Sequence, residues 1–199
     1  MFRSDIFWLL PALLVAIYEV FFIWNKLPLE QESSTEVKGE YNQYDQLKIG
    51  YLINCCYLIF WIQLVFPLFT ISSNNALVIL LRIVGYFLII WGTVLAVLAL
   101  KKLGRNWSGM DQYQIKKGHQ LVTTGVYKLV RHPIYSGVLM EIIGFELVAN
   151  SWFVLPLSIG TFWVFKNHIA KEEKLLAQKF EERLQDYRSK TKTLIPFLY

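Results

Sequence analysis

The sequence predicts an all-helical integral membrane protein with about five transmembrane helices. Of its 199 residues, 55% are hydrophobic and 18% are charged, so its apolar content exceeds the roughly 45–50% of a soluble domain. The apolar residues gather into five segments separated by polar residues, and basic residues concentrate in alternate connections. Disordered, collagen-like and disulfide-stabilised classes are excluded, because the two cysteines, Cys55 and Cys56, are adjacent within an apolar run.

The first three apolar segments are each long enough to cross a bilayer: Ile6–Trp24, Ile49–Ile71 and Leu77–Leu100. A helix rises about 1.5 Å per residue, so about 20 apolar residues cross the hydrocarbon core. Ile6–Trp24 is not followed by a small-residue cleavage site, and we expect it to remain as the first crossing. The polar connection 25–48 shows no apolar period and is expected to be a flexible loop.

Two shorter apolar segments follow, Ile134–Ala149 with 16 residues and Trp152–Phe165 with 14. Only two residues join them, so we expect a short helical hairpin that is tilted or incompletely spanning. In the stretch 169–188, apolar residues recur at helical spacing with charged residues largely on the other side. This pattern predicts a C-terminal helix that lies at the membrane interface.

The distribution of lysine and arginine sets the expected orientation. In a five-crossing arrangement, the connections 25–48, 101–133 and 166–199 hold 18 of the 20 basic residues. The positive-inside rule therefore places the N-terminus outside and the C-terminus in the cytosol. The expected membrane is the plasma membrane in a prokaryote or the endoplasmic reticulum in a eukaryote. The net charge of +5 is thus attributed to topology, and no nucleic-acid partner is expected.

The densest run of chemically versatile residues, 118–137, lies against the start of the fourth apolar segment. Its glycines allow close approach of backbone to a ligand, and Pro133 at a helix start leaves outward N–H groups that can receive a carboxylate. A second group, 168–173, follows the fifth segment on the same predicted side, and its Glu172 and Glu173 are candidates for holding a cationic cofactor. The alternatives are an ordinary loop-to-membrane junction and an acidic first helical turn.

Three acidic residues, Glu19, Glu141 and Glu146, lie within predicted crossings. An unpaired charge there costs about 2.5–3.5 kcal/mol, so each must face protein, water or a partner. Glu141 lies six residues beyond Tyr135 and is a candidate to line the same cavity, whereas Glu19 suits a structural hydrogen bond equally well.

The motif Arg131-His132-Pro133-x-Tyr135-x-Gly137, followed by Glu172-Glu173, resembles the isoprenylcysteine carboxyl methyltransferase family and the related phospholipid N-methyltransferases. The resemblance runs from about Leu103 to Pro196. It implies a membrane enzyme that uses S-adenosylmethionine. In the single membrane domain 1–199, three N-terminal transmembrane helices within 1–100 would then precede a cofactor-binding methyltransferase core at 101–199.

The resemblance also implies site residues. Around the cofactor it places His119, Leu121, Val122, Gly125, Tyr127, His132, Pro133, Tyr135, Glu172 and Glu173. Arg131 would lie nearest the reacting end, and Glu141 and His168 complete the candidate catalytic set; no metal is expected. His168 stands where the family usually has an arginine that faces the substrate, so the methyl acceptor stays open.

Methyl transfer is an in-line displacement, so the protein must mainly align the acceptor and exclude water. A carboxylate acceptor is ionised at neutral pH and needs no base, whereas an amine or thiol would need one, with Glu141, His132 or His168 as candidates. We expect a hydrophobic acceptor, such as a prenylated small molecule or protein C-terminus, that enters from the bilayer. The alternatives are a phospholipid amine N-methyltransferase, a membrane NADPH-dependent sterol or enone reductase, and a non-enzymatic membrane interaction protein. The sequence does not predict the oligomeric state.

Overall fold

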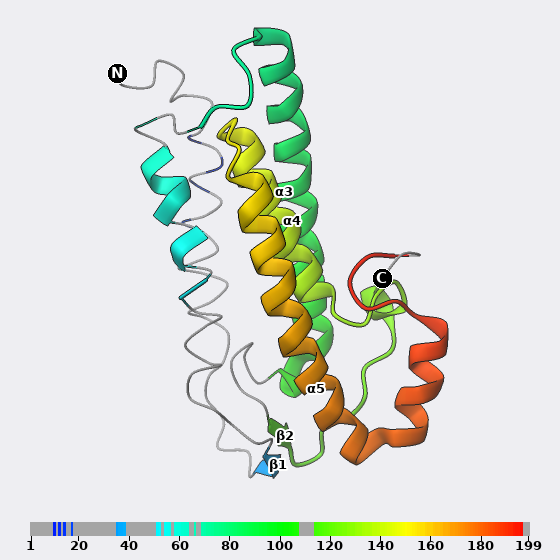
Figure 1. The fold of residues 1–199 in the computed structure, drawn as a ribbon. Helices are drawn as coiled ribbons and strands as arrows, with labels where there is room; N and C mark the ends of the chain where they lie inside the picture. The colour runs from blue at the N-terminus through cyan, green and yellow to red at the C-terminus, as the bar shows by residue number, and fades with distance from the viewer. Residues whose placement is uncertain are drawn as a thin grey trace. The chain divides into compact units, whose positions relative to one another are not determined.

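The chain is mainly helical, as predicted, and it also contains one small sheet (Figure 1). The computed structural model describes residues 10, 12, 14, 17, 35–38, 51, 52, 54–56, 58–63, 66, 69–107 and 114–196. The chain divides into two compact units. The first gathers residues 1–28, 51–93 and 138–162, and the second gathers residues 29–50, 94–137 and 163–199.

Three long helices dominate the described residues: α3 (Asn75–Leu103), α4 (Pro133–Val148) and α5 (Val154–Lys190). Two 3₁₀ turns, Gly104–Asn106 and Gly125–Lys128, lie between α3 and α4. The range of α5 covers two helical parts that meet at Phe180: the first begins in the fifth apolar segment and continues well past residue 169, so the predicted boundary before the C-terminal helix lies later in the chain than expected. The helix bends at Phe180, whose φ of −126° and ψ of 28° are not helical.

Helix α3 has a capped start and a largely exposed apolar surface. Asn74 Oδ1 accepts hydrogen bonds from the N–H groups of Ala76 at 3.0 Å and Leu77 at 3.3 Å. Among the described residues, Asn75–Asn106 is the one helical stretch long and apolar enough to cross a membrane, with a mean hydropathy of 2.4. Only 33% of its apolar window is buried, which is typical of a helix that faces lipid.

The first unit has an apolar core that encloses a polar pair. The core cluster contains Ala12, Phe60, Ile89, Phe145, Val148 and Ala149. Beside it, the side-chain nitrogen of Gln63 donates to both carboxylate oxygens of Glu146, at 3.2 and 3.0 Å, and both side chains are buried. This pairing satisfies the requirement, inferred from the sequence, that an acid within an apolar segment has a polar partner.

A tight turn joins α4 to α5 within the first unit. Asn150 takes a left-handed conformation with φ of 55°, which asparagine tolerates better than most residues. Its side chain donates to the carbonyl oxygen of Ser72 at 2.7 Å and accepts from the N–H of Ser72 at 3.3 Å. The turn is thereby fastened to the chain just before α3.

The second unit contains a two-stranded antiparallel sheet of β1 (Thr35–Lys38) and β2 (Gln114–Lys116), with Val37 opposite Ile115. The expectation of a flexible loop is therefore wrong for 35–38, because four residues are too few to show a strand period in sequence. Ile115 is 1% exposed and packs with Leu175 and Leu176 of α5. Strand β2 is thus fixed against α5.

The C-terminal segment 191–194 packs against the start of α4, also within the second unit. Val130 and Lys192 form a parallel β-bridge. The N–H of Arg131 donates to the carbonyl of Lys192 at 2.8 Å, and the N–H of His132 donates to the carbonyl of Thr193 at 3.0 Å. These backbone bonds bring the end of the chain to the residues that the sequence marks as a candidate site.

Candidate active site

The second unit encloses a pocket of about 900 Å³, including its opening to solvent. One wall is apolar and aromatic, with Trp107, Ile115, Leu176 and Leu184 among its residues. Another wall carries charged and polar side chains from the start of α4 and from the middle of α5.

Nine of the ten residues predicted to bind a cofactor line this pocket: His119, Leu121, Val122, Tyr127, His132, Pro133, Tyr135, Glu172 and Glu173. Arg131 lines it too. Gly125 does not; it begins the 3₁₀ turn with φ of 68°, and a Cβ there would meet the side chain of Lys102. Its role is therefore to turn the chain.

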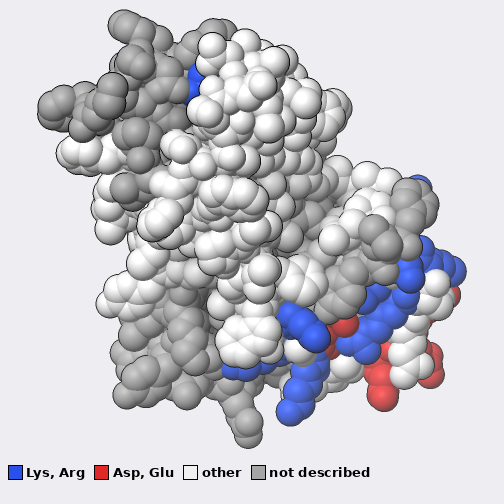
Figure 2. Space-filling model, turned by 45° about the horizontal axis from the view of Figure 1, so that its top comes forward, with Lys and Arg blue, Asp and Glu red and all other residues white. Residues whose placement is uncertain are grey.

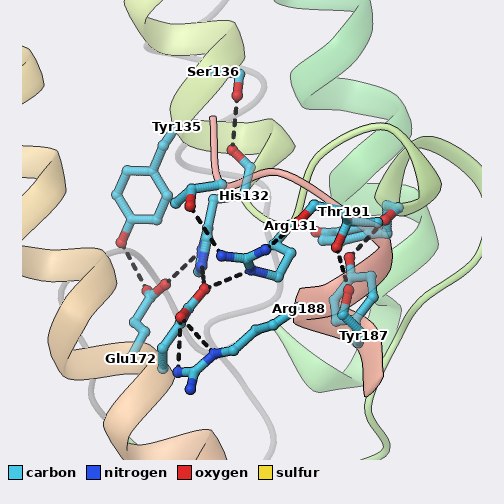
Figure 3. A network of polar contacts seen from close by, with 11 residues as sticks. Arg131, His132, Tyr135, Ser136, Glu172, Tyr187, Arg188 and Thr191 are labelled. Carbon is cyan, nitrogen blue, oxygen red and sulfur yellow. Dashed lines mark hydrogen bonds and ion pairs between the residues drawn. The ribbon is translucent and has the colours of Figure 1, made fainter. Parts of the chain in front are cut away.

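Glu173 is the centre of the charged wall, and its partners Arg131, His132 and Arg188 are labelled in Figure 3. Its Oε1 accepts hydrogen bonds from Arg131 Nε at 2.8 Å and from His132 Nε2 at 3.2 Å. Its Oε2 accepts from Arg188 Nε at 2.9 Å and forms an ion pair with Arg188 Nη2 at 2.8 Å. One carboxylate therefore holds together the start of α4 and two parts of α5.

His132 lies between the two glutamates. Its Nδ1 is 3.3 Å from Glu172 Oε2, and its Nε2 is 3.2 Å from Glu173 Oε1. Glu172 also accepts a hydrogen bond from the Tyr135 hydroxyl at 2.7 Å. Because each ring nitrogen faces a carboxylate oxygen, the arrangement favours an imidazolium that donates on both sides.

The pKa values of this cluster follow from burial opposed by charge. Burial alone would lower the pKa of His132, but hydrogen bonds and charges from Glu172 and Glu173 outweigh it, and the pKa is raised above 6.5. Burial alone would raise the pKa of Glu173, but His132 and Arg131 lower it from 4.5 to about 2. Both shifts favour the ion-paired state.

Arg131 is held by three different partners. Besides Glu173, its Nη1 donates to the carbonyl oxygen of Thr191, and its Nη2 donates to Thr193 Oγ1 at 3.0 Å. The planar guanidinium fixes these three directions at once. Arg131 therefore connects Glu173 to the C-terminal segment.

Tyr187 closes the pocket from the part of α5 beyond the bend. Its hydroxyl donates to the carbonyl oxygen of Tyr127 at 2.6 Å, and both side chains are buried. Burial, together with the nearby Glu172 for Tyr127, raises the pKa of both phenols. The Tyr187 hydroxyl thus stays protonated and remains a donor at physiological pH.

The two other candidate catalytic residues lie outside this lining. Glu141 is on α4 and is 4% exposed, and His168 is on α5 and is 3% exposed. Neither is among the residues that line the pocket, although Glu172 and Glu173 on the same helix as His168 are. Burial of these two side chains makes them part of the interior of the protein.

The apolar wall contains residues that were not assigned to the site from the sequence. They are Leu103, Asn106, Trp107, Ile115, Ile134, Leu175, Leu176, Leu184 and Tyr187. Three of these, Leu176, Leu184 and Tyr187, belong to the apolar face recognised in 169–188. The helical period alone predicts contact with the membrane interface, whereas the family resemblance implies that the C-terminal helix helps to enclose the cofactor, and these three residues do line the pocket.

Residues 83–178, which include most of the pocket lining, match the model of the isoprenylcysteine carboxyl methyltransferase family. The chain resembles this family, as its sequence predicts. A protein-S-isoprenylcysteine O-methyltransferase of Saccharomyces cerevisiae is 31% identical over 134 residues, which are 67% of this chain and 56% of that protein. The Xenopus laevis protein of the same name is 31% identical over 119 residues, or 59% of this chain and 41% of that protein.

A solved structure of this family also matches. It is the structure of the eukaryotic intramembrane Ras methyltransferase, isoprenylcysteine carboxyl methyltransferase, without a monobody. The TM-score is 0.60 and the sequence identity 28%, over 80% of this chain and 55% of that one. The chain thus spans about half the length of these curated and solved relatives.

Proposed function

We propose that this protein is an integral membrane methyltransferase that uses S-adenosylmethionine and acts on a prenylated acceptor with a free carboxylate. The observation that carries this proposal is the pocket of the second unit, which gathers nine of the ten residues expected around the cofactor. All nine lie within the segment 83–178 that matches the isoprenylcysteine carboxyl methyltransferase family. The bound cofactor supplies an activated methyl group.

The lining fits the parts of this cofactor. An adenosine moiety needs apolar and aromatic walls, which Trp107, Tyr127 and Tyr187 offer. The ammonium of an amino-acid moiety needs a carboxylate, which the Glu172 side chain offers on the polar wall.

Most charged side chains of this wall are paired with one another, so they position the wall and do not contact the ligand directly. Both oxygens of Glu173 accept hydrogen bonds from arginine or histidine, so we assign Glu173 and Arg131 as positioning residues. Glu172 has fewer partners and is 25% exposed, so it is the carboxylate best placed to meet a ligand ammonium. Tyr135, which donates to Glu172, sets the direction of that carboxylate.

The proposed acceptor needs no general base, because a carboxylate is already ionised at neutral pH. This agrees with the positions of Glu141 and His168, which are buried and do not line the pocket. We assign neither to the cofactor pocket. They would become candidate bases only for an amine or thiol acceptor.

We further propose five crossings, with the N-terminus outside and the C-terminus in the cytosol. Helix α3 supports this topology through its exposed apolar surface and its mean hydropathy of 2.4 over the candidate span. The basic connections that hold 18 of the 20 lysines and arginines, including 101–133 and 166–199, then lie on the cytosolic side with the pocket lining. The first crossing, Ile6–Trp24, lies largely outside the described residues.

The decisive experiment is calorimetric titration of S-adenosylhomocysteine into detergent-purified full chain. We expect micromolar binding by the wild type and at least tenfold weaker binding by Glu172→Gln, because the variant loses the charge that meets the ligand ammonium. Glu181→Gln serves as the matched control, since Glu181 is exposed on the same helix and does not line the pocket. Absence of binding by folded wild type overturns the proposal.

The acceptor is then identified by methyl transfer. The purified protein is incubated with labelled S-adenosylmethionine and either a small prenylated cysteine or a phospholipid with a primary amine. Labelling of the prenylated cysteine supports the proposed acceptor, and labelling of the phospholipid alone replaces it with the N-methyltransferase alternative. A parallel titration with NADPH tests the reductase alternative, which binding of NADPH in place of S-adenosylhomocysteine would establish.

A further inference from the structure

A second hollow lies on the second unit, beside the C-terminal end of α5. It is a groove of about 590 Å³, including its opening to solvent. Four of its lining residues are basic: Lys128, Arg188, Lys190 and Lys192. The bridge between Val130 and Lys192 holds its two sides together. Figure 2 shows most of the visible lysine and arginine side chains gathered in one region of the surface, with aspartate and glutamate side chains beside them.

Two of the four basic groups are already paired. Arg188 pairs with Glu173 at 2.8 Å, and Lys190 pairs with Asp186 at 2.6 Å, where both side chains are more than 60% exposed. Within the described part of the chain, no ion pair involves Lys128 or Lys192. The groove therefore carries a net positive charge, contributed chiefly by these two lysines.

Apolar side chains adjoin this charge. Leu129 lines the groove and is 57% exposed, and Ile195, next to the lining residue Pro196, is 40% exposed. Exposed leucine and isoleucine beside lysine are typical of a surface that meets the boundary between headgroups and acyl chains. A free anion has no acyl chain that could contact these apolar side chains, so they favour a lipid as the ligand.

The position of the groove along the chain also indicates that it lies at the boundary between lipid headgroups and acyl chains. Helix α4 begins at Pro133, five residues after Lys128, and its 16 residues contain only two acidic or basic side chains, Glu141 and Glu146. The groove thus lies where the chain enters an apolar helix. Basic clusters at such an entry attract anionic phospholipids.

We infer that this groove binds the headgroup of an anionic phospholipid, with Lys128 and Lys192 on the phosphate and Leu129 toward the acyl chains. The site lies next to the proposed active site, because Arg188 lines the groove and also pairs with Glu173. An occupied groove holds the C-terminal segment and Arg188 in place. The ligand class is a lipid headgroup and not free phosphate.

The test titrates lipids into the full chain in an uncharged detergent and counts bound molecules by native mass spectrometry. The probes are a phosphatidylglycerol, a phosphatidylcholine of the same acyl chains, and inorganic phosphate. We expect phosphatidylglycerol to bind at least tenfold more tightly than phosphatidylcholine. Lys128→Gln with Lys192→Gln should weaken its binding about thirtyfold, from the usual contribution of two lysines near an anionic surface.

Two control variants distinguish lipid binding in this groove from a nonspecific effect of the net charge of the protein. Lys117→Gln with Lys174→Gln removes the same charge at exposed positions that do not line the groove, and should leave lipid binding unchanged. Lys128→Arg with Lys192→Arg should retain it. Equal weakening in both glutamine variants, equal affinity for the two lipids, or full displacement by millimolar phosphate would overturn the inference. S-adenosylhomocysteine binding, measured on the same samples, shows that each variant is folded and tests the proposed function separately.

Discussion

Arg131 and Glu173 lie 42 positions apart in the sequence, yet Arg131 Nε donates to Glu173 Oε1 at 2.8 Å. Their side chains are 12% and 13% exposed, so the pair is shielded from water and from salt. The contact joins the residue just before α4 to the middle of α5. Arg131 also reaches Thr191 and Thr193, so a single side chain links three segments of the second unit.

Replacing Arg131 with lysine is predicted to loosen the C-terminal segment although it keeps the charge. A lysine ammonium is a single point and cannot hold Glu173, Thr191 and Thr193 in the three directions of a guanidinium. Hydrogen exchange at 191–194 should become at least tenfold faster in Arg131→Lys. The exposed Arg183→Lys is the control and should exchange as the wild type does. Unchanged exchange in Arg131→Lys would show that the three contacts do not hold this segment.

Glu173→Gln is predicted to be more destabilising than Glu172→Gln. Glu173 accepts from Arg131, His132 and Arg188, and its loss leaves partly buried cations without a counter-charge, at a cost of about 2–3 kcal/mol. Glu172 accepts from one neutral hydroxyl and one histidine, so its loss should cost about 1 kcal/mol. Thermal unfolding in detergent measures both; a larger drop for Glu172→Gln would contradict the assignment of Glu173 as the centre of the cluster.

The polar part of the pocket was predictable from the sequence, together with Leu121 and Val122, whereas the apolar part contributed by α5 was not assigned to the site residue by residue. His132, Glu172 and Glu173 are chemically conspicuous, and their order matches a family motif, so they were identified without coordinates. Leu176 and Leu184 are apolar residues on an amphipathic helix, which serve equally well against lipid, core or ligand. Only the bend at Phe180 and the packing of the chain decide that they face a pocket.

The ends of the helices were likewise only partly predictable from the sequence. The start of α4 was located within one residue because Pro133 marks it, whereas no proline or glycine separates the fifth apolar segment from the charged residues that follow. A change from apolar to polar composition was therefore interpreted as a break between helices. In the structure the same helix continues through that change, since composition alters the environment of a helix and not its backbone.

Gly85 and Gly144 are predicted to tolerate no side chain, because they allow α3 and α4 to approach closely within the first unit. A Cβ on Gly85 would lie 2.7 Å from the carbonyl oxygen of Gly144, and a Cβ on Gly144 would lie 2.6 Å from that of Gly85. Backbone atoms cannot move aside cheaply, so either alanine variant should lower stability by about 1–3 kcal/mol. Gly160→Ala is the control, since its Cβ would meet no atom within 4 Å, and it should be neutral or stabilising. Thermal unfolding of the three variants measures this, and equal midpoints would refute the close approach.

The stability of the charged cluster is predicted to be greatest between about pH 4.5 and 6.5. The folded pKa of His132 is raised above 6.5, so its contribution is complete below that pH and is lost as pH rises through the folded value. The folded pKa of Glu173 is lowered from 4.5 to about 2, so its contribution is complete above 4.5 and is lost as pH falls toward 2. The unfolding midpoint of the wild type, measured relative to that of His132→Gln, should therefore decline above pH 6.5. A difference that stays constant from pH 5 to 9 would mean that folding does not shift the pKa of His132, and a difference that rises from pH 5 to 6.5 would mean that His132 is neutral in the folded protein; either result would contradict the prediction.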